Sequence, residues 1–245
     1  MSRILRFVYS LYCIIPFTIS FFITVPCYFF IFNFCTKHRA PHVAHALSRG
    51  WALYLFVFFF IRIKINNKEY INPNQVYVFV ANHLSFLDIP LYARSCTNTL
   101  RFLSKAELAK IPLLGYVIKN LYITVDRADK NDRLKSLNKM KASLDEGISV
   151  FLAPEGTRNT THQALLDFRD GAFRLAINAQ IPLAILTIKN SQHLLSPFRP
   201  LEMRPGIIYA EWTQPIQTIG MNEEDVPLLK NQTKEAMIKI LNSRE

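Results

Sequence analysis

The chain has 245 residues, of which half are hydrophobic and 19% charged, with a formal net charge of +11. A chain of this length can bury one full-sized hydrophobic core with an appendage. The proportions of hydrophobic and charged residues exclude both a polytopic membrane protein and a disordered chain. The first 68 residues hold eight basic side chains and no acidic one. A nucleic-acid-binding protein would carry such an excess on its folded domain, so we expect no nucleic-acid partner. We expect contact with an anionic membrane surface instead, although basic flanks that only set insertion topology are an equal alternative.

Residues 7–36 contain no charged side chain. As a helix they would reach about 45 Å, against about 30 Å for the hydrocarbon core of a bilayer, and they are too long for a signal peptide. A second apolar run, Trp51–Ile61, is too short to span. Either one span precedes an interfacial helix, or a two-helix hairpin dips into one leaflet. We favour the hairpin and predict membrane-associated helices over residues 1–64 and a folded domain over 65–245.

Potential metal ligands are few and badly spaced. None of the four cysteines (Cys13, Cys27, Cys35 and Cys96) forms a C-x-x-C pair. They are typical of buried small hydrophobic residues in a reducing compartment. His42-x-x-His45 lacks a third ligand nearby, so we predict no metal site.

From about residue 65 the pattern is that of an α/β protein. Short β-rich runs occur at 76–81, 100–104, 122–125, 148–153, 182–188 and 207–212. They are apolar nearly throughout, which is typical of strands buried on both faces of a parallel sheet. Helical spacing of apolar residues intervenes over 134–144, with Asn131 or Asp132 as the expected cap, and over 172–179 and 226–241. The sequence predicts a mostly parallel central sheet flanked by helices.

His83 and Asp88 follow the first of these runs and are candidates for a base and its orienting carboxylate. In one helix they would lie about 140° apart, so contact needs a strand end, a loop and a helix start. Ser85-x-x-Asp88 resembles a capping box, with Ser85 at the cap and Asp88 in the first turn. Asp88 would then accept the Nδ1 proton of His83 and leave Nε2 free as a general base. Helix capping alone would also explain Ser85 and Asp88.

The segment 154–158, Pro-Glu-Gly-Thr-Arg, follows another buried run. Gly156 permits a tight turn with exposed amide hydrogens, and Arg158 offers a planar fork that matches two phosphate oxygens. Glu155 would orient a guanidinium or hydrogen-bond an acceptor hydroxyl. The alternative is a surface turn with an ordinary ion pair. Two further cations that follow strand-like runs, and that equally fit solvated loop charges, are Lys105 and Arg127.

These segments resemble, in chain order, the four motif blocks of the glycerophospholipid acyltransferases. The resemblance is greatest to bacterial 1-acyl-glycerol-3-phosphate (lysophosphatidic acid) acyltransferases and covers about residues 65–215, with the motif blocks at about 76–190. The blocks are Asn82-His83-x4-Asp88, Gly115 with Asp126-Arg127, residues 151–158, and Ile181-Pro182. A further stretch, 168–173, also resembles the family, in which Lys is more usual than Arg169.

The resemblance implies acyl transfer from acyl-CoA or acyl-carrier protein to the free hydroxyl of lysophosphatidic acid, which makes phosphatidic acid. His83 would act as the base and Asp88 would orient it, without a metal or bound cofactor. The acceptor site would comprise Glu155, Gly156, Thr157, Arg158, Arg127 and Lys105, with Pro182 shaping the pocket. The expected location is the cytoplasmic face of the cell inner membrane. Alternatives are another acceptor (glycerol-3-phosphate or a lyso-aminolipid), a hydrolase, or a lipid-binding protein without catalysis.

Overall fold

The computed structural model describes residues 1–126 and 128–243. Its centre is a seven-stranded sheet with the order β1-β7-β6-β2-β5-β3-β4, in which only β6 and β7 pair antiparallel. The strands are β1 (Ile61–Asn66), β2 (Val78–Ala81), β3 (Leu100–Lys105), β4 (Ile123–Val125), β5 (Ser149–Leu152), β6 (Leu183–Ile188) and β7 (Gly206–Trp212). The expectation of a mostly parallel central sheet is therefore confirmed.

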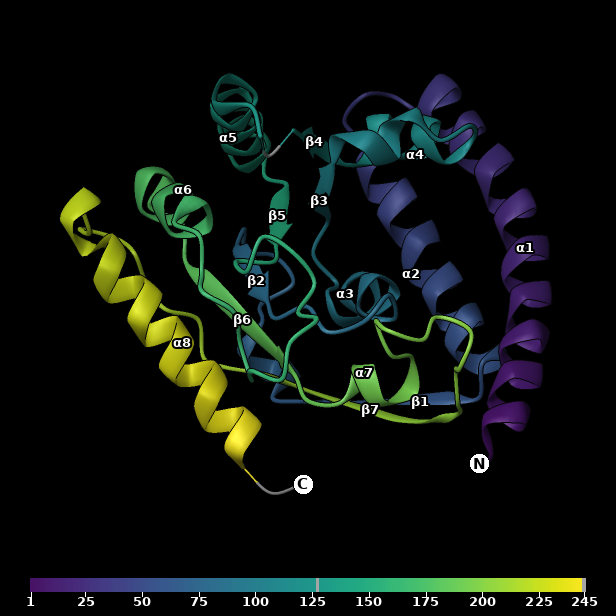
Figure 1. Ribbon diagram of the computed structural model, residues 1–245. Helices are drawn as coiled ribbons and strands as arrows, with labels where there is room; N and C mark the ends of the chain where they lie inside the picture. The colour runs from purple at the N-terminus through teal and green to yellow at the C-terminus, as the bar shows by residue number, and fades with distance from the viewer. Residues whose placement is uncertain (127, 244–245) are drawn as a thin grey trace.

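Helices cover both faces of this sheet (Figure 1). They are α1 (Arg3–Phe34), α2 (Ala40–Phe58), α3 (Asp88–Ser95), α4 (Leu114–Leu121), α5 (Lys130–Asp145), α6 (Gly171–Ala179), α7 (Ser191–Leu194) and α8 (Val226–Asn242). On one face Val78 and Val150 pack with Phe173 and residues of α5 and α8, and on the other Phe79 packs with residues of α2 and α3. Every residue of β2, β5 and β6 is buried, which explains their continuous apolar sequences.

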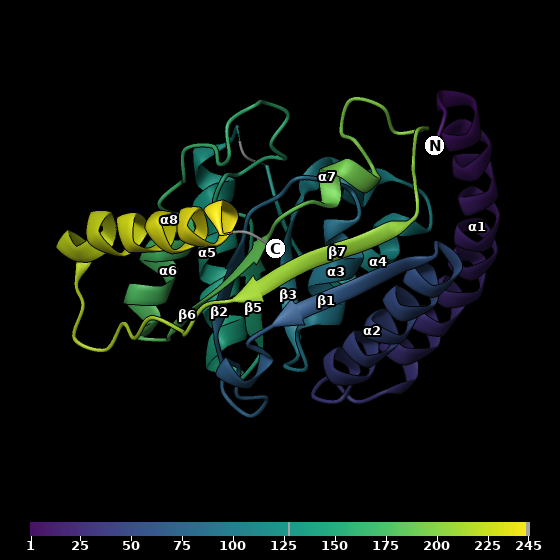
Figure 2. The ribbon, with the colours of Figure 1, turned by 90° about the horizontal axis from the view of Figure 1, so that it is seen from below.

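The beginning of the sheet differs from the prediction. The apolar run Trp51–Ile61 divides, because α2 ends at Phe58 and the edge strand β1 begins at Ile61. β1 alternates between apolar and polar residues and pairs in parallel with β7 (Figure 2). The sheet thus starts inside the segment 1–64. The cap of α5 also differs: the Asp129 side chain accepts from the N–H of Asn131.

The N-terminal helix α1 lies along the domain. Near its start, Ser10 Oγ accepts from the N–H of Met203 at 2.8 Å, and near its end Asn33 Nδ2 donates to the Tyr116 hydroxyl at 2.9 Å. Within the described residues, α1 is the one helix long and apolar enough to cross a membrane by length and composition. Much of its surface is exposed and apolar, as at Ile23, which is consistent with membrane association.

Candidate functional site

Three polar loops meet at one edge of the sheet. β2 lies between β5 and β6 and is parallel to both, so the carboxyl ends of these strands share an edge. His83 follows β2, the segment 154–158 follows β5, and Ser191 follows β6. The loops come from segments that are about 70 to 110 residues apart in the sequence. The parallel topology makes them neighbours in space.

His83 and Asp88 form the predicted pair. His83 Nδ1 lies 2.9 Å from Asp88 Oδ2, which also accepts the N–H groups of Leu84 at 2.6 Å and Ser85 at 2.7 Å. The cap differs from the expectation, because α3 begins at Asp88 and the Ser85 hydroxyl donates to the carbonyl of Leu195 at 2.8 Å. The Asp88 side chain is fully buried, whereas 18% of the His83 side chain is exposed. Solvent can therefore reach the imidazole of His83 but not the carboxylate of Asp88.

Ser191, which sequence reasoning missed, completes the surroundings of Asp88. Its hydroxyl donates to Asp88 Oδ1 in a short hydrogen bond. Both carboxylate oxygens thus accept hydrogen bonds, and Oδ2 accepts from two backbone N–H groups besides lying against Nδ1. Since this oxygen acts as an acceptor, Nδ1 of His83 is the donor of the pair and Nε2 presents its lone pair. The available sequence signal was a serine closely following the predicted strand 182–188.

Asn82 connects two of the strand ends. Its side chain is fully buried, donating to the carbonyl of Ile188 and accepting from the N–H of Ile188, both at 2.8 Å. The Tyr92 hydroxyl donates to the Asn82 carbonyl at 2.6 Å. These bonds fix the end of β2 against that of β6, so the residue that follows, His83, stands on a rigid support.

Glu155 holds the second motif against the first. Its Oε1 accepts from the N–H of His83 and its Oε2 from the N–H of Leu166, both at 2.9 Å. The N–H of Asn159 donates in turn to the His83 carbonyl at 2.7 Å. Burial raises the pKa of Glu155, against the lowering effect of these two amides. Both oxygens are bonded to backbone, so Glu155 joins two loops, a role that differs from the two expected ones of orienting a guanidinium and hydrogen-bonding the acceptor hydroxyl.

Arg158 has unused donors at this edge. Its guanidinium lies 3.8 Å from the centre of the Phe86 ring, and its buried Nε and Nη1 have no hydrogen-bond partner among the residues that the structure describes. A negatively charged acceptor is the partner that such a cationic donor favours. Gly156 has a positive φ of 72°, as a tight turn requires, but its N–H donates to the Ala153 carbonyl. The prediction of exposed amide hydrogens is therefore wrong for Gly156, whereas Thr157 is exposed.

The other predicted site residues lie differently. Lys105 ends β3 and pairs with Glu107 at 3.1 Å, with 56% of its side chain exposed. Arg127 lies outside the described residues. Pro182 is buried just before β6, at the opposite edge of the sheet from His83. His83 follows the carboxyl end of β2, whereas Pro182 lies at the amino ends of the parallel strands, so a part of Pro182 in shaping the pocket stays a prediction.

The fold and the arrangement of this edge define the class of glycerophospholipid acyltransferases. Residues 62–189, just over half of the chain, match the sequence profile of the Acyltransferase family, and the chain belongs to that family.

Relatives and a solved structure agree with this assignment. The chain is 32% identical over 180 residues to an uncharacterized acyltransferase of Schizosaccharomyces pombe, a match that covers 72% of this chain and 64% of that protein. It is 28% identical over 182 residues to 1-acyl-sn-glycerol-3-phosphate acyltransferase alpha of Mus musculus, covering 74% and 64%. These matches span slightly less than two thirds of both relatives. The crystal structure of the 1-acyl-sn-glycerophosphate (LPA) acyltransferase PlsC from Thermotoga maritima has the same fold, with a TM-score of 0.83 and 23% identity over all of both chains.

Proposed function

We propose that this protein transfers an acyl group from an acyl thioester to the free hydroxyl of 1-acyl-glycerol-3-phosphate, making phosphatidic acid. The observation that carries the proposal is the contact between His83 Nδ1 and the buried carboxylate of Asp88, beside the unpartnered donors of Arg158. A neutral base and an anion-binding group at one edge are what this reaction needs. The names of the relatives support the same acceptor.

The reaction follows from the tautomer of His83. Nε2 takes the proton of the acceptor hydroxyl as its oxygen attacks the thioester carbonyl, forming the new C–O bond. The C–S bond then breaks, and the imidazolium returns the proton to the departing thiolate. Asp88 stabilises the transient imidazolium. The donor would be acyl-CoA or acyl-carrier protein.

The acceptor phosphate would bind Arg158. Its buried Nε and Nη1 lie in the loop that is fastened to the His83 loop through Glu155. The guanidinium lies over the Phe86 ring, which limits the directions in which its planar set of donors can point. Lys105, at the end of β3, and Arg127 are further candidates for neutralising this phosphate.

The N-terminal helices would lie in one leaflet. Both ends of α1 contact the domain, through Ser10 with Met203 and through Asn33 with Tyr116. If α1 crossed the bilayer, the domain surface that lies along it would be carried into the hydrocarbon. A hairpin of α1 and α2 in one leaflet avoids this cost and holds the site near the headgroups. We place the enzyme on the cytoplasmic face of the inner membrane, where acyl thioesters are made.

An acyl-transfer assay tests the function. Membranes containing the protein are incubated with radiolabelled palmitoyl-CoA or palmitoyl-carrier protein and with lysophosphatidic acid, glycerol-3-phosphate or a lyso-aminolipid. We expect labelled phosphatidic acid from lysophosphatidic acid alone. Label in another product reassigns the acceptor, and free fatty acid without any acceptor identifies a hydrolase. If neither an acylated lipid nor free fatty acid is formed, the alternative of a lipid-binding protein without catalysis is favoured.

A further inference from the structure

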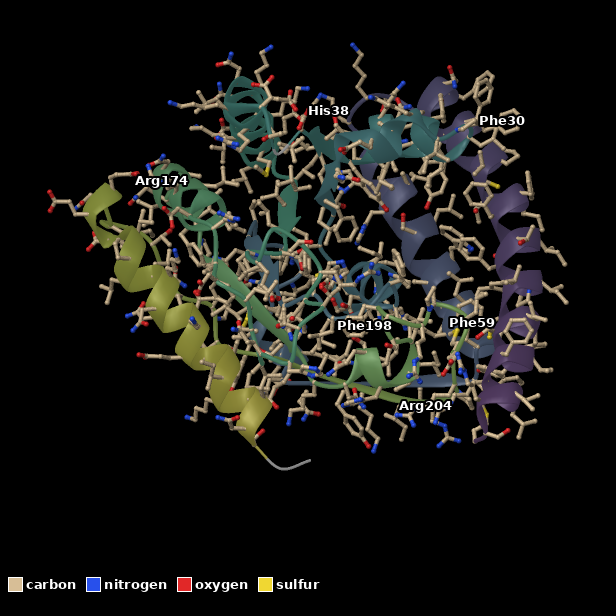
Figure 3. The ribbon with its side chains drawn as sticks, viewed as in Figure 1. Phe30, His38, Phe59, Arg174, Phe198 and Arg204 are labelled. Carbon is tan, nitrogen blue, oxygen red and sulfur yellow. The ribbon has the colours of Figure 1, made fainter. Side chains whose placement is uncertain are left out.

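A basic groove lies beside the catalytic edge, between the start of α1 and the connection from α7 to β7. It has a volume of about 530 Å³. Its lining residues are Arg6, His162, Gln192, His193, Ser196, Phe198, Arg199, Glu202 and Arg204. Phe198 and Arg204 lie on the connection that passes near the start of α1 (Figures 2 and 3).

Two residues that line this groove each have a buried side-chain atom without a hydrogen-bond partner in the part of the chain that the structure describes. These atoms are Nε of Arg6 and Oε1 of Gln192. A buried donor or acceptor without a partner costs free energy, so a ligand that supplies a partner is favoured. An unpartnered donor of an arginine in a groove calls for an acceptor that carries negative charge.

The balance of charge in the groove is positive. Its lining includes three arginines, Arg6, Arg199 and Arg204, and one carboxylate, that of Glu202. This carboxylate is shared with arginines, lying 2.7 Å from Arg3 and 3.4 Å from Arg199. Among the described residues, neither Arg6 nor Arg204 has a carboxylate partner. The groove therefore has an excess of positive charge that favours an anionic ligand.

The groove adjoins the reacting groups through α7. Gln192 directly follows Ser191, whose hydroxyl holds Asp88. The other end of α7 is tied to the same loop, since Ser85 donates to the carbonyl of Leu195. A ligand beside Gln192 is thus next to the helix that positions the carboxylate. Arg158 does not line this groove, so the two anion sites are distinct.

We propose that this groove binds the phosphate-bearing pantetheine arm of the acyl donor, an inference that rests on the proposed function. A transfer between two phosphorylated substrates needs two anion sites, and Arg158 supplies only one. A neighbouring depression shares Phe198, Arg199 and Glu202 with the groove and is more apolar, with Ile4 and Leu201 exposed in it.

Kinetics with matched donors test this assignment. The full-length protein in detergent micelles is given palmitoyl-CoA or S-palmitoyl-pantetheine, which lacks the phosphates, at saturating lysophosphatidic acid. For Arg6→Gln and Arg204→Gln we expect kcat/KM to fall about tenfold with palmitoyl-CoA and less than twofold with palmitoyl-pantetheine. The KM for lysophosphatidic acid should stay constant. Arg6→Lys, which keeps the charge, should retain most activity, and thermal unfolding checks the fold of each variant.

Arg174→Gln is the matched control, since Arg174 is a surface arginine on α6, in the opposite helical layer (Figure 3). It should change neither rate. An equal loss with both donors in the groove variants, or a higher KM for lysophosphatidic acid, would overturn the proposal. The proposal would also be overturned if the groove variants kept wild-type kinetics with both donors but no longer sedimented with phosphatidylglycerol vesicles. The groove would then bind bilayer headgroups.

Calorimetric titration with CoA, which has the phosphates but no acyl chain, separates this proposal from the proposed function. We expect binding to the wild-type protein and at least tenfold weaker binding to the Arg6→Gln/Arg204→Gln double variant. If the protein binds CoA in this way but transfers no acyl group, the proposed function fails and the groove stands. If it makes phosphatidic acid while both proteins bind CoA equally, or neither binds it, the groove assignment fails alone.

Discussion

The carboxylate of Glu155 accepts a hydrogen bond from the backbone N–H of His83, at 2.9 Å. Its other oxygen accepts from the N–H of Leu166, so one buried side chain holds two loops in place. We expect Glu155→Gln to lose one of these contacts, because an amide NH2 cannot accept. It should lower kcat about tenfold and the unfolding free energy by about 1–3 kcal/mol. Steady-state kinetics and thermal unfolding measure both, with the exposed Glu224→Gln as control; unchanged values would contradict the role.

His83→Ala and Asp88→Asn should each reduce acyl transfer at least a hundredfold, since the first removes the base and the second the group that holds its tautomer. Circular dichroism and membrane fractionation should match those of the wild type. The exposed His38→Ala, in the connection between α1 and α2, is the control for loss of a histidine (Figure 3). Substantial turnover by either site variant would rule out the mechanism.

Ser191→Ala should reduce kcat about fivefold and leave both KM values unchanged. The substitution leaves Asp88 Oδ1 without its hydroxyl donor, which weakens the support of the imidazole without touching either substrate. Ser191→Thr keeps the hydroxyl and should restore most of the rate. Equal kcat values for the two variants would show that the Ser191 hydroxyl does not support the imidazole.

Arg158→Ala should raise the KM for lysophosphatidic acid at least tenfold, because the acceptor phosphate loses a charged, two-donor partner. Arg158→Lys should recover little, since an ammonium group offers neither the planar fork nor the same stack on Phe86. The measurement is the dependence of initial rate on acceptor concentration at a saturating donor concentration. A KM that stays constant would show that the phosphate binds elsewhere.

His45 makes stability depend on pH. Burial lowers its pKa to about 4, with Arg49 and His42 adding to the effect and the Cys96 carbonyl opposing it. Between pH 6.5 and 4 the unfolded chain binds a proton that the folded protein does not, so the unfolding free energy falls as the pH drops, by up to about 3 kcal/mol. His45→Gln lacks this contribution. Its Tm should therefore fall less than that of the wild type between pH 7 and pH 4.5, and equal decreases would refute the assignment.

The strands and the His83–Asp88 contact could be predicted because both depend on local pattern. Continuous apolar runs mark strands buried on two faces, and a five-residue spacing after a strand allows a loop to bring the two side chains together. Pro182 begins a strand and His83 follows one, so in a parallel sheet the two residues lie at opposite edges. Ser191 and the groove depend on contacts between segments about 100 to 200 residues apart, such as Ser10 with Met203, for which the sequence has no local signal.

The attachment of α1 to residues 202–203 has a practical consequence for anyone who wants a version of this protein free of detergent. Deleting α1 would also remove Arg6, which lines the groove, and would expose the part of the hydrophobic core to which Cys13 belongs. A fragment without α1 would therefore be a poor substitute for the full chain in ligand screening, even if it stayed in solution.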